Sequence, residues 1–343
     1  MKAAITGKGL VSPIGDGKEE LLLPIADDGW FSAQKPNFSK YFEAKKARRT
    51  SKILKMGLVA AYDALGDDRT NLQGIIVGTG LGCVGDSGKF LTSLITYNET
   101  LLSPTSFIQS THNTIAGSIA LNLKIHQYNL TYSERIFSFE WSLLDALMQI
   151  NESEDNLRFL VGSADEMTKN TFEIAKEISV YHEFEESSRD IVNKKSPRVT
   201  AGEMSCFFTL EQANNKDASL HFVKMYFQEK VADVLKNIFE ELKNNGLESI
   251  DCILLGINGH QAYDKAYDEV IDAFKESDIA YFKHLCGESL TASSFGFWLA
   301  NEILLKNEVP KIASIRKNKK SIRTVLIINH LKTDYLSAML LSI

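Results

Sequence analysis

The chain has 343 residues, a hydrophobic fraction of 44% and a formal net charge of −6. This length exceeds one average domain, and this composition is that of a folded globular protein. The acidic balance disfavours nucleic-acid binding, and no apolar run reaches the roughly 18–20 residues that a membrane helix needs.

The cysteine pattern excludes two further classes. Cys83, Cys206, Cys252 and Cys286 are widely separated, and neither Cys-x-x-Cys pairs nor clustered histidines occur. We therefore predict no zinc site and no disulfide framework. No signal-peptide pattern follows Met1, so the protein is expected to be cytoplasmic.

Strand-like runs alternate with helical stretches along the chain, which predicts an α/β protein with mostly buried sheets. The predicted strands are Ala3–Thr6, Gly74–Val77, Leu157–Val161, Cys206–Leu210, Leu220–Phe227, Cys252–Leu255, Ile279–Phe282, Thr324–Ile328 and Leu336–Ile343. The predicted helices are Ile53–Leu65, Phe137–Ile150, Asp233–Asn245, Tyr263–Ser277 and Thr291–Leu305. The polar stretch Glu185–Thr200 is predicted to be a long loop.

The segment Asn129–Ala146 has the pattern of a catalytic elbow without its nucleophile. A β-prone run ends near Ser133, and helical spacing of apolar residues begins after Phe137. The N-terminus of such a helix has free N–H groups and a positive dipole, so it can hold a thiolate or an oxyanion. The residue at the turn is Ile136, which can hold neither.

This segment resembles the nucleophile elbow of the β-ketoacyl-acyl carrier protein synthases, the condensing enzymes of the thiolase fold. Ungapped alignment on Thr131 and Asp145 places the family's cysteine on Ile136 and the serine that follows it on Ser138. Other segments that resemble landmarks of the family are Ala4–Gly15, Arg48-Arg49 before the Ala-rich helix Leu58–Leu65, Gly78–Gly82, Pro104–Ala120, Val161–Glu166 and Ala201–Glu203. The resemblance implies a duplicated α-β-α-β-α architecture, with thiolase-like halves at residues 1–212 and 213–343 in one compact unit.

Condensation in this family needs a cysteine, two imidazoles and an oxyanion hole. His260, after the strand Cys252–Leu255, resembles the first imidazole; the alternative is a structural histidine. The segment Lys283–Glu288 is similar to the family's Lys-x-x-x-Gly-His motif, with Lys283 on the lysine and Glu288 on the histidine. A carboxylate there would repel an enolate, and the alternative is a buried Lys283–Glu288 ion pair. The final segment Asn329–Asp334 lacks the glycines of the family's oxyanion loop.

Two other patterns offer different chemistry. Cys286 lies two residues before Glu288 and could replace the lost thiol, although a buried and inert cysteine is the default interpretation. Gly80–Gly85 satisfies the dinucleotide pattern Gly-x-Gly-x-x-Gly, but no helical pattern opens at Gly85, and Glu99 lies too close for a ribose-binding acid. The condensing-enzyme turn explains the same glycines, so no cofactor and no metal are predicted.

The resemblance implies a role that keeps the scaffold without the chemistry. In type II polyketide systems a catalytic ketosynthase pairs with a homologue that lacks the cysteine, the chain-length factor, and this chain is most similar to those of aryl-polyene and flexirubin-type clusters. Pro104–Leu121 and the strand before Ile136 would form the interface. The bulky residues expected to fill or limit an acyl pocket are Phe107, Ile136, Phe137, Phe139 and Trp141, and their alternative role is plain core.

The expected partners are a ketosynthase and an acyl carrier protein. The dense basic segments Lys45–Arg49 and Lys317–Lys320 could dock an acidic carrier, or simply be solvated. Two rival functions stay open: an active condensing enzyme or acyltransferase with an unrecognised nucleophile, and a non-catalytic homodimer that binds acyl-CoA or acyl carrier protein.

Overall fold

The computed structural model describes residues 2–24, 26, 29–100, 102–184, 190–193, 195–214, 216–330 and 334–343. Its main feature is an 11-stranded sheet in the order β11-β10-β9-β12-β13-β8-β1-β7-β4-β2-β3. The strands of this sheet are β1 (Ala3–Val11), β2 (Gly74–Gly78), β3 (Tyr128–Tyr132), β4 (Phe159–Asp165), β7 (Met204–Gln212), β8 (Ser219–Phe227), β9 (Cys252–Leu255), β10 (Asp278–Tyr281), β11 (Ser314–Arg316), β12 (Thr324–His330) and β13 (Tyr335–Ser342). A separate small sheet pairs β5 (Tyr181–His182) with β6 (Val199–Thr200).

The two halves of the chain repeat one topology. In the first half the order is β3-β2-β4-β7-β1, and in the second the corresponding strands lie in the order β10-β9-β12-β13-β8. In each half three strands are parallel and the last two are antiparallel. The halves join where Ala3 of β1 pairs with Leu220 of β8. The architecture is therefore duplicated, and the proposed division at residues 212/213 falls in the β7–β8 connection.

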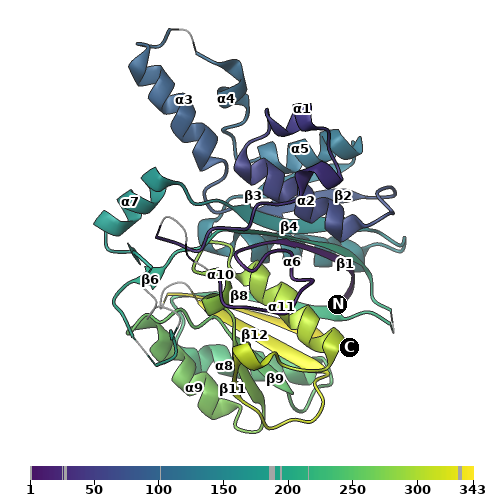
Figure 1. The fold of residues 1–343 in the computed structure, drawn as a ribbon. Helices are drawn as coiled ribbons and strands as arrows, with labels where there is room; N and C mark the ends of the chain where they lie inside the picture. Colours follow the sequence, from purple (N-terminus) through teal and green to yellow (C-terminus); the bar gives the residue numbers. More distant parts are fainter. Residues whose placement is uncertain are drawn as a thin grey trace.

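The helices form three layers, one on each outer side of the sheets and one between them (Figure 1). α2 and α5 cover β1, β7, β4 and β2; α6 and α11 lie between the two halves; and α8 and α9 cover the outer face of the second half. The helix bounds are α1 (Ala44–Ala47), α2 (Lys52–Leu65), α3 (Val84–Thr96), α4 (Pro104–Ile108), α5 (Thr114–Leu123), α6 (Ser138–Glu152), α7 (Lys169–Glu177), α8 (Val231–Asn244), α9 (Ala266–Ala273), α10 (Lys283–Cys286) and α11 (Ser293–Lys306). Among the described residues, none of these helices combines the length and the apolar character that crossing a bilayer requires.

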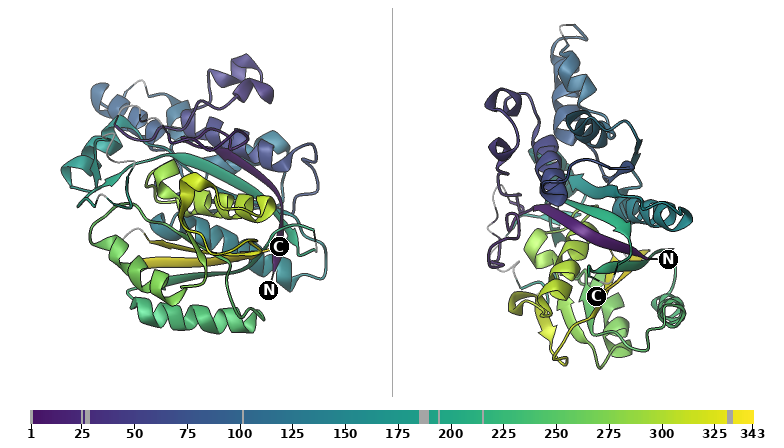
Figure 2. Two further views of the ribbon diagram at one scale, coloured as in Figure 1. Left: turned by 60° about the horizontal axis from the view of Figure 1, so that its bottom comes forward. Right: turned by 90° about the vertical axis from the view of Figure 1, so that its right-hand side faces the viewer.

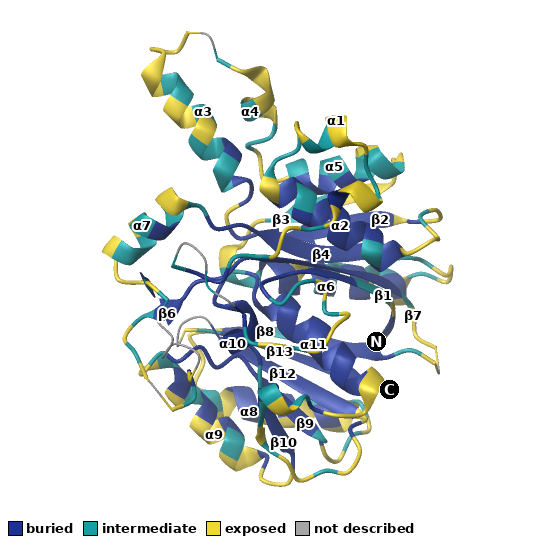
Figure 3. Ribbon diagram, in the orientation of Figure 1, coloured by how far each residue is buried: buried dark blue, intermediate teal, exposed yellow. Residues whose placement is uncertain are grey.

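Strand side chains alternate between these layers, as the period of two requires. In β12, Val325 and Ile327 pack in the central core with α6 and α11, whereas Leu326 and Ile328 pack in the outer core with α8 and α9. Both faces of the sheets are thus covered by helices. This explains why the strands read as continuous apolar runs, and why α11, which lies between the halves, is buried along almost its whole length (Figure 3).

The segment from α3 to α4 extends away from the body as an arm (Figure 2). Here the sequence predictions fail twice. A helix does follow Gly80–Gly85, because α3 begins at Val84; it was missed because it buries almost no apolar side chain. The segment Pro104–Ala120, which by resemblance to the family should be one interface helix, contains two helices, α4 and α5, and only the second packs on the sheet.

Other predicted bounds shift less. The predicted helix Tyr263–Ser277 consists of the 3-10 turn Tyr263–Lys265 followed by the shorter α9. The predicted loop Glu185–Thr200 ends in β6, and its residues 185–189 and 194 lie outside the described residues, as do Leu331, Lys332 and Thr333 of the predicted final loop.

Candidate functional site

The elbow has the expected strand–turn–helix geometry. β3 ends at Tyr132, a 3-10 turn spans Arg135–Phe137, and α6 begins at Ser138. Arg135 has φ +51°, a left-handed conformation that is strained for a residue with a side chain. Ser138 Oγ fixes the turn by donating to the carbonyl oxygens of Thr79 at 3.0 Å and Arg135 at 2.8 Å. The half-buried residue in this turn, Ile136, has no group that can act as a nucleophile.

The four cysteines lie in environments that disfavour a thiolate. All four are buried, and burial raises the pKa of the Cys83 and Cys206 thiols to about 12. Cys286, the predicted alternative, is fully buried, and burial raises its pKa well above its ordinary value. Because the thiolate is the reactive form, the raised pKa values disfavour a nucleophilic role for these cysteines at neutral pH.

The Lys283–Glu288 ion pair, weighed from the sequence, is present. Lys283 Nζ lies 2.7 Å from Glu288 Oε2, and both side chains are 1% exposed. Lys283 also donates to the carbonyl oxygen of His330 at 2.7 Å, and Asn258 Nδ2 donates to Glu288 Oε2 at 2.7 Å. Burial raises the pKa of Glu288, and Lys283 and Asn258 oppose that shift. The ammonium group of Lys283 is therefore paired with a carboxylate and a carbonyl oxygen in this structure.

Two histidines lie beside this pair in different environments. His260, predicted as the remnant imidazole, is half-buried and stacks on Tyr263 with ring centroids 3.6 Å apart. Its backbone N–H donates to Asn258 Oδ1, and the same Asn258 side chain donates to Glu288, whereas the His260 ring Nδ1 accepts the backbone N–H groups of Ala262 and Tyr263. His330 is buried and stacks on Tyr267 at 4.5 Å. Burial lowers the pKa of His330 well below its usual range, so this imidazole is neutral.

Asp264 connects the same region to the loop after residue 190. Its carboxylate accepts backbone N–H groups from Asn258 and Gly259, and Lys195 Nζ donates to Oδ2 at 2.8 Å. Its other oxygen lies 3.6 Å from His330 Nε2. Asn258, Asp264, Lys195 and His330 were not predicted as site residues.

Glu140 extends the group of buried polar residues around Lys283 and Glu288 to α6, the helix of the elbow. It is fully buried in the first turn of α6, and its Oε1 accepts a hydrogen bond from Ser337 Oγ at 2.7 Å. Burial raises its pKa, and Lys283 is near enough to oppose the shift. Within the described part of the chain, Glu140 Oε2, Glu288 Oε1 and both ring nitrogens of His330 are buried without a hydrogen-bond partner. Among the described residues, the centre of the molecule thus holds one fully buried ion pair, Lys283–Glu288, together with several buried polar atoms that have no hydrogen-bond partner.

The residues predicted to limit an acyl pocket do not come together. Phe139 is fully buried in the central core against Phe208 and Phe297, whereas Phe137 packs on Tyr335 at 5.7 Å. Phe107 is 57% exposed on the arm. Trp141 is 40% exposed on the outer face of α6. Phe139 therefore has the alternative role of plain core.

The Gly-rich turn is not arranged to hold a nucleotide. The Asp165 carboxylate accepts the backbone N–H groups of Gly80 and Leu81 and the hydroxyl groups of Thr79 and Thr291. The amides that would contact a phosphate are therefore already bound to a buried carboxylate. Among the described residues, no group of histidine, cysteine, aspartate and glutamate side chains is placed to hold a metal ion.

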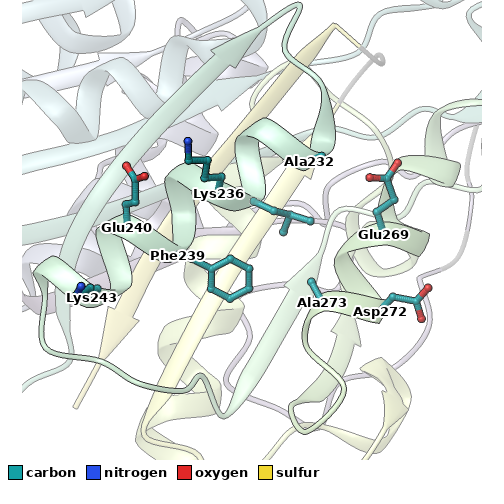
Figure 4. Close-up of a pocket in the computed structure, with 9 residues that line it drawn as sticks. Ala232, Lys236, Phe239, Glu240, Lys243, Glu269, Asp272 and Ala273 are labelled. Carbon is teal, nitrogen blue, oxygen red and sulfur yellow. The ribbon is translucent and has the colours of Figure 1, made fainter.

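The surface of the described residues has several hollows, and two of them are lined mainly by helix residues. One of about 820 Å³ runs between α8 and α9, with Phe239 on its floor and Lys236, Lys243, Glu269 and Asp272 along its rim (Figure 4). It lies on the outer face of the second half and contains none of the predicted site residues. The other, of about 380 Å³, lies beside β3 and the outer face of α6, next to the elbow.

Comparison with known proteins decides the family. Residues 27–219 match the family model described as the N-terminal domain of β-ketoacyl synthase. The chain belongs to the β-ketoacyl synthase family. Among curated proteins, none matches this chain in sequence.

Solved structures of similar fold come from ketosynthase systems. One is the ishigamide ketosynthase/chain length factor, with 16% identity over 99% of this chain and 98% of that one, at a TM-score of 0.80. Another is a type II polyketide synthase acyl-carrier protein in complex with its ketosynthase bound to the hexaketide (16% identity, 99% of both chains, TM-score 0.72). A third is the ketosynthase ApeO in complex with its chain length factor ApeC from Xenorhabdus doucetiae (15% identity, 99% and 98%, TM-score 0.72). These likenesses confirm the predicted thiolase fold.

Proposed function

We propose that this β-ketoacyl synthase family member is the non-catalytic partner, a chain-length factor, of an active ketosynthase. The proposal rests on one observation: the strand, turn and helix of the elbow are present, but Ile136 occupies the position of the nucleophile. Family chemistry needs a thiolate there, and every cysteine of the chain is buried. The paired state of Lys283 and Glu288 supports the same conclusion, since neither charge is free for a malonyl group.

An apolar face beside the elbow supports the partner role. β3 is the last strand of the sheet and pairs only with β2 among the described strands, so its outer edge is open. An open edge of this kind invites pairing with another chain. Large apolar side chains are exposed on β3 and on the two helices that contact it: Tyr128 on β3, Leu121 on α5, and Trp141 and Met148 on α6. Phe107 and Ile108 are exposed on the arm. Exposed apolar side chains beside an open strand edge are typical of a protein interface.

The carrier protein would approach through the first of the two basic segments. Lys45, Arg48 and Arg49 are exposed, and within the described residues none of them has an ion-pair partner. The second segment has fewer such cations: Lys317 lies 3.6 Å from Glu308, and only Lys319 and Lys320 have no ion-pair partner among the described residues. Unpaired cations suit a strongly acidic partner, so we assign carrier docking to the segment around α1.

Co-expression with a ketosynthase from the same organism tests the proposal. A 1:1 complex on size exclusion that extends chains from malonyl carrier protein, with no activity from this chain alone, is the expected result. A stable homodimer that ignores the ketosynthase would favour the acyl-binding homodimer. Self-acylation from acyl-CoA would favour an active enzyme, and Cys286→Ala would then be the first variant to examine.

A further inference from the structure

The hollow beside β3 has an unusual lining. It is surrounded by aromatic and apolar side chains and by carboxylates, and among the described residues that line it there is no lysine, arginine or histidine. The residues that matter for its chemistry are Tyr128, Tyr132, Trp141, Asp145, Met148 and Glu152.

The aromatic side chains form a surface rather than a packed core. Tyr132 and Trp141 stack with ring centroids 6.3 Å apart and ring planes inclined by 18°. Trp141 is 40% exposed and Met148 is 43% exposed, so one side of this stack faces the hollow. An exposed indole face attracts a cation, and a guanidinium group adds planar stacking to that attraction.

Asp145 gives the hollow a negative charge. Tyr128 OH donates to its Oδ2 at 3.0 Å and Gln149 Nε2 donates to its Oδ1 at 2.8 Å, so the carboxylate is held in place by neutral donors. Burial, with the carboxylate of Asp145 adding to it, raises the pKa of Tyr128 and Tyr132 to about 12. Both tyrosines thus stay neutral, and neither they nor Gln149 offsets the charge of Asp145.

From this geometry we infer that the hollow receives an arginine side chain of the ketosynthase partner. The aliphatic stem would lie along Met148, the guanidinium would stack on Trp141, and its N–H groups would donate to Asp145. Charge complementarity selects a cation, and the aromatic surface selects arginine over lysine. The inference rests on the proposed function, because the hollow adjoins the open edge of β3 that we assign to the partner.

A first experiment uses the isolated chain and a side-chain probe. Trp141 is the reporter, because Trp30 and Trp298 are only 4% and 2% exposed. N-acetylarginine amide should change the tryptophan fluorescence, and the change should saturate with a dissociation constant of roughly 1 mM. This dissociation constant corresponds to a binding free energy of about 4 kcal/mol. The neutral isostere N-acetylcitrulline amide should not, and Asp145→Asn should abolish the arginine effect. Equal responses to the two probes, or none to either, would overturn the inference.

A second experiment uses the complex with the ketosynthase. Asp145→Asn should weaken association at least about tenfold, since truncating one partner of a buried charge pair has a large cost. The matched control is Glu177→Gln on α7, an exposed carboxylate remote from β3, which should leave association unchanged.

The two experiments separate the two ideas. A complex that Asp145→Asn leaves intact removes the arginine site but retains the partner role. If no ketosynthase binds at all, the proposed function fails, and the probe titration alone decides whether the hollow binds a guanidinium group.

Discussion

Removing one member of the buried ion pair should be far more harmful than removing both. In Lys283→Met the Glu288 carboxylate would stay buried with Asn258 as its only hydrogen-bond donor, and the carbonyl oxygen of His330 would lose its donor. Breaking a buried pair in this way typically costs about 3–5 kcal/mol. The entropy of unfolding is about 2.1 cal/mol/K per residue, which gives about 0.7 kcal/mol/K for this chain. The melting temperature should therefore fall by about 4–7 °C.

The control is the double variant Lys283→Met/Glu288→Leu, which replaces the pair by apolar groups of similar size. Its free energy of unfolding should lie within about 2 kcal/mol of the wild type, because no uncompensated charge remains buried. Both variants are compared by urea denaturation and calorimetry. The single variant should also recover stability as the pH falls from 8 to 5. Burial holds the folded-state pKa of Glu288 above its unfolded value, so proton uptake relieves the buried charge. A double variant that is less stable than the single variant would refute this reasoning.

Three further predictions follow from single sites. Gly202→Ala would place a Cβ 1.8 Å from the carbonyl oxygen of Cys286 and should lower stability in urea titrations by at least about 2 kcal/mol, whereas Gly88→Ala, which meets nothing within 4 Å, should be neutral or stabilising. Burial raises the pKa of Glu166 to about 7, so its stability contribution is present below its unfolded pKa and lost as pH rises through about 7. Glu166→Gln should therefore gain stability relative to wild type between pH 5 and 8, and a pH-independent difference would contradict this. Ile136→Cys should not create condensing activity with malonyl carrier protein, because Lys283 and Glu288 still bind each other; measurable condensation would show that the site lacks only its thiol.

The fold was largely predictable because its strands are buried on both faces. Continuous apolar runs such as Cys252–Leu255 mark such strands directly, and β9 has these same bounds. The arm was not predictable in this way. α3 exposes Leu91 and Ile95 and does not pack these side chains against the sheet. The apolar spacing that marks a packed helix therefore gives no clear signal in this segment.

The candidate site was predictable only where its parts lie close in sequence. Lys283 and Glu288 are five residues apart across one short helix, which suggested their pairing. Lys195 and Asp264 form an ion pair although they are 69 residues apart in the sequence, and no local pattern predicts that contact. Two missed residues did leave signals. His330 ends β12, two residues beyond the pairing of Ile328 with the last residue of β9, and Glu140 is an acid on the apolar face of α6.

The most direct test of the partner role is to find which subunit carries the growing chain. The complex of this protein with its ketosynthase would be incubated with acyl carrier protein bearing an acyl group, and intact-mass spectrometry would follow both subunits. The account predicts a stoichiometric acyl adduct on the ketosynthase and none on this chain. An adduct on this chain that survives inactivation of the ketosynthase cysteine would contradict the account.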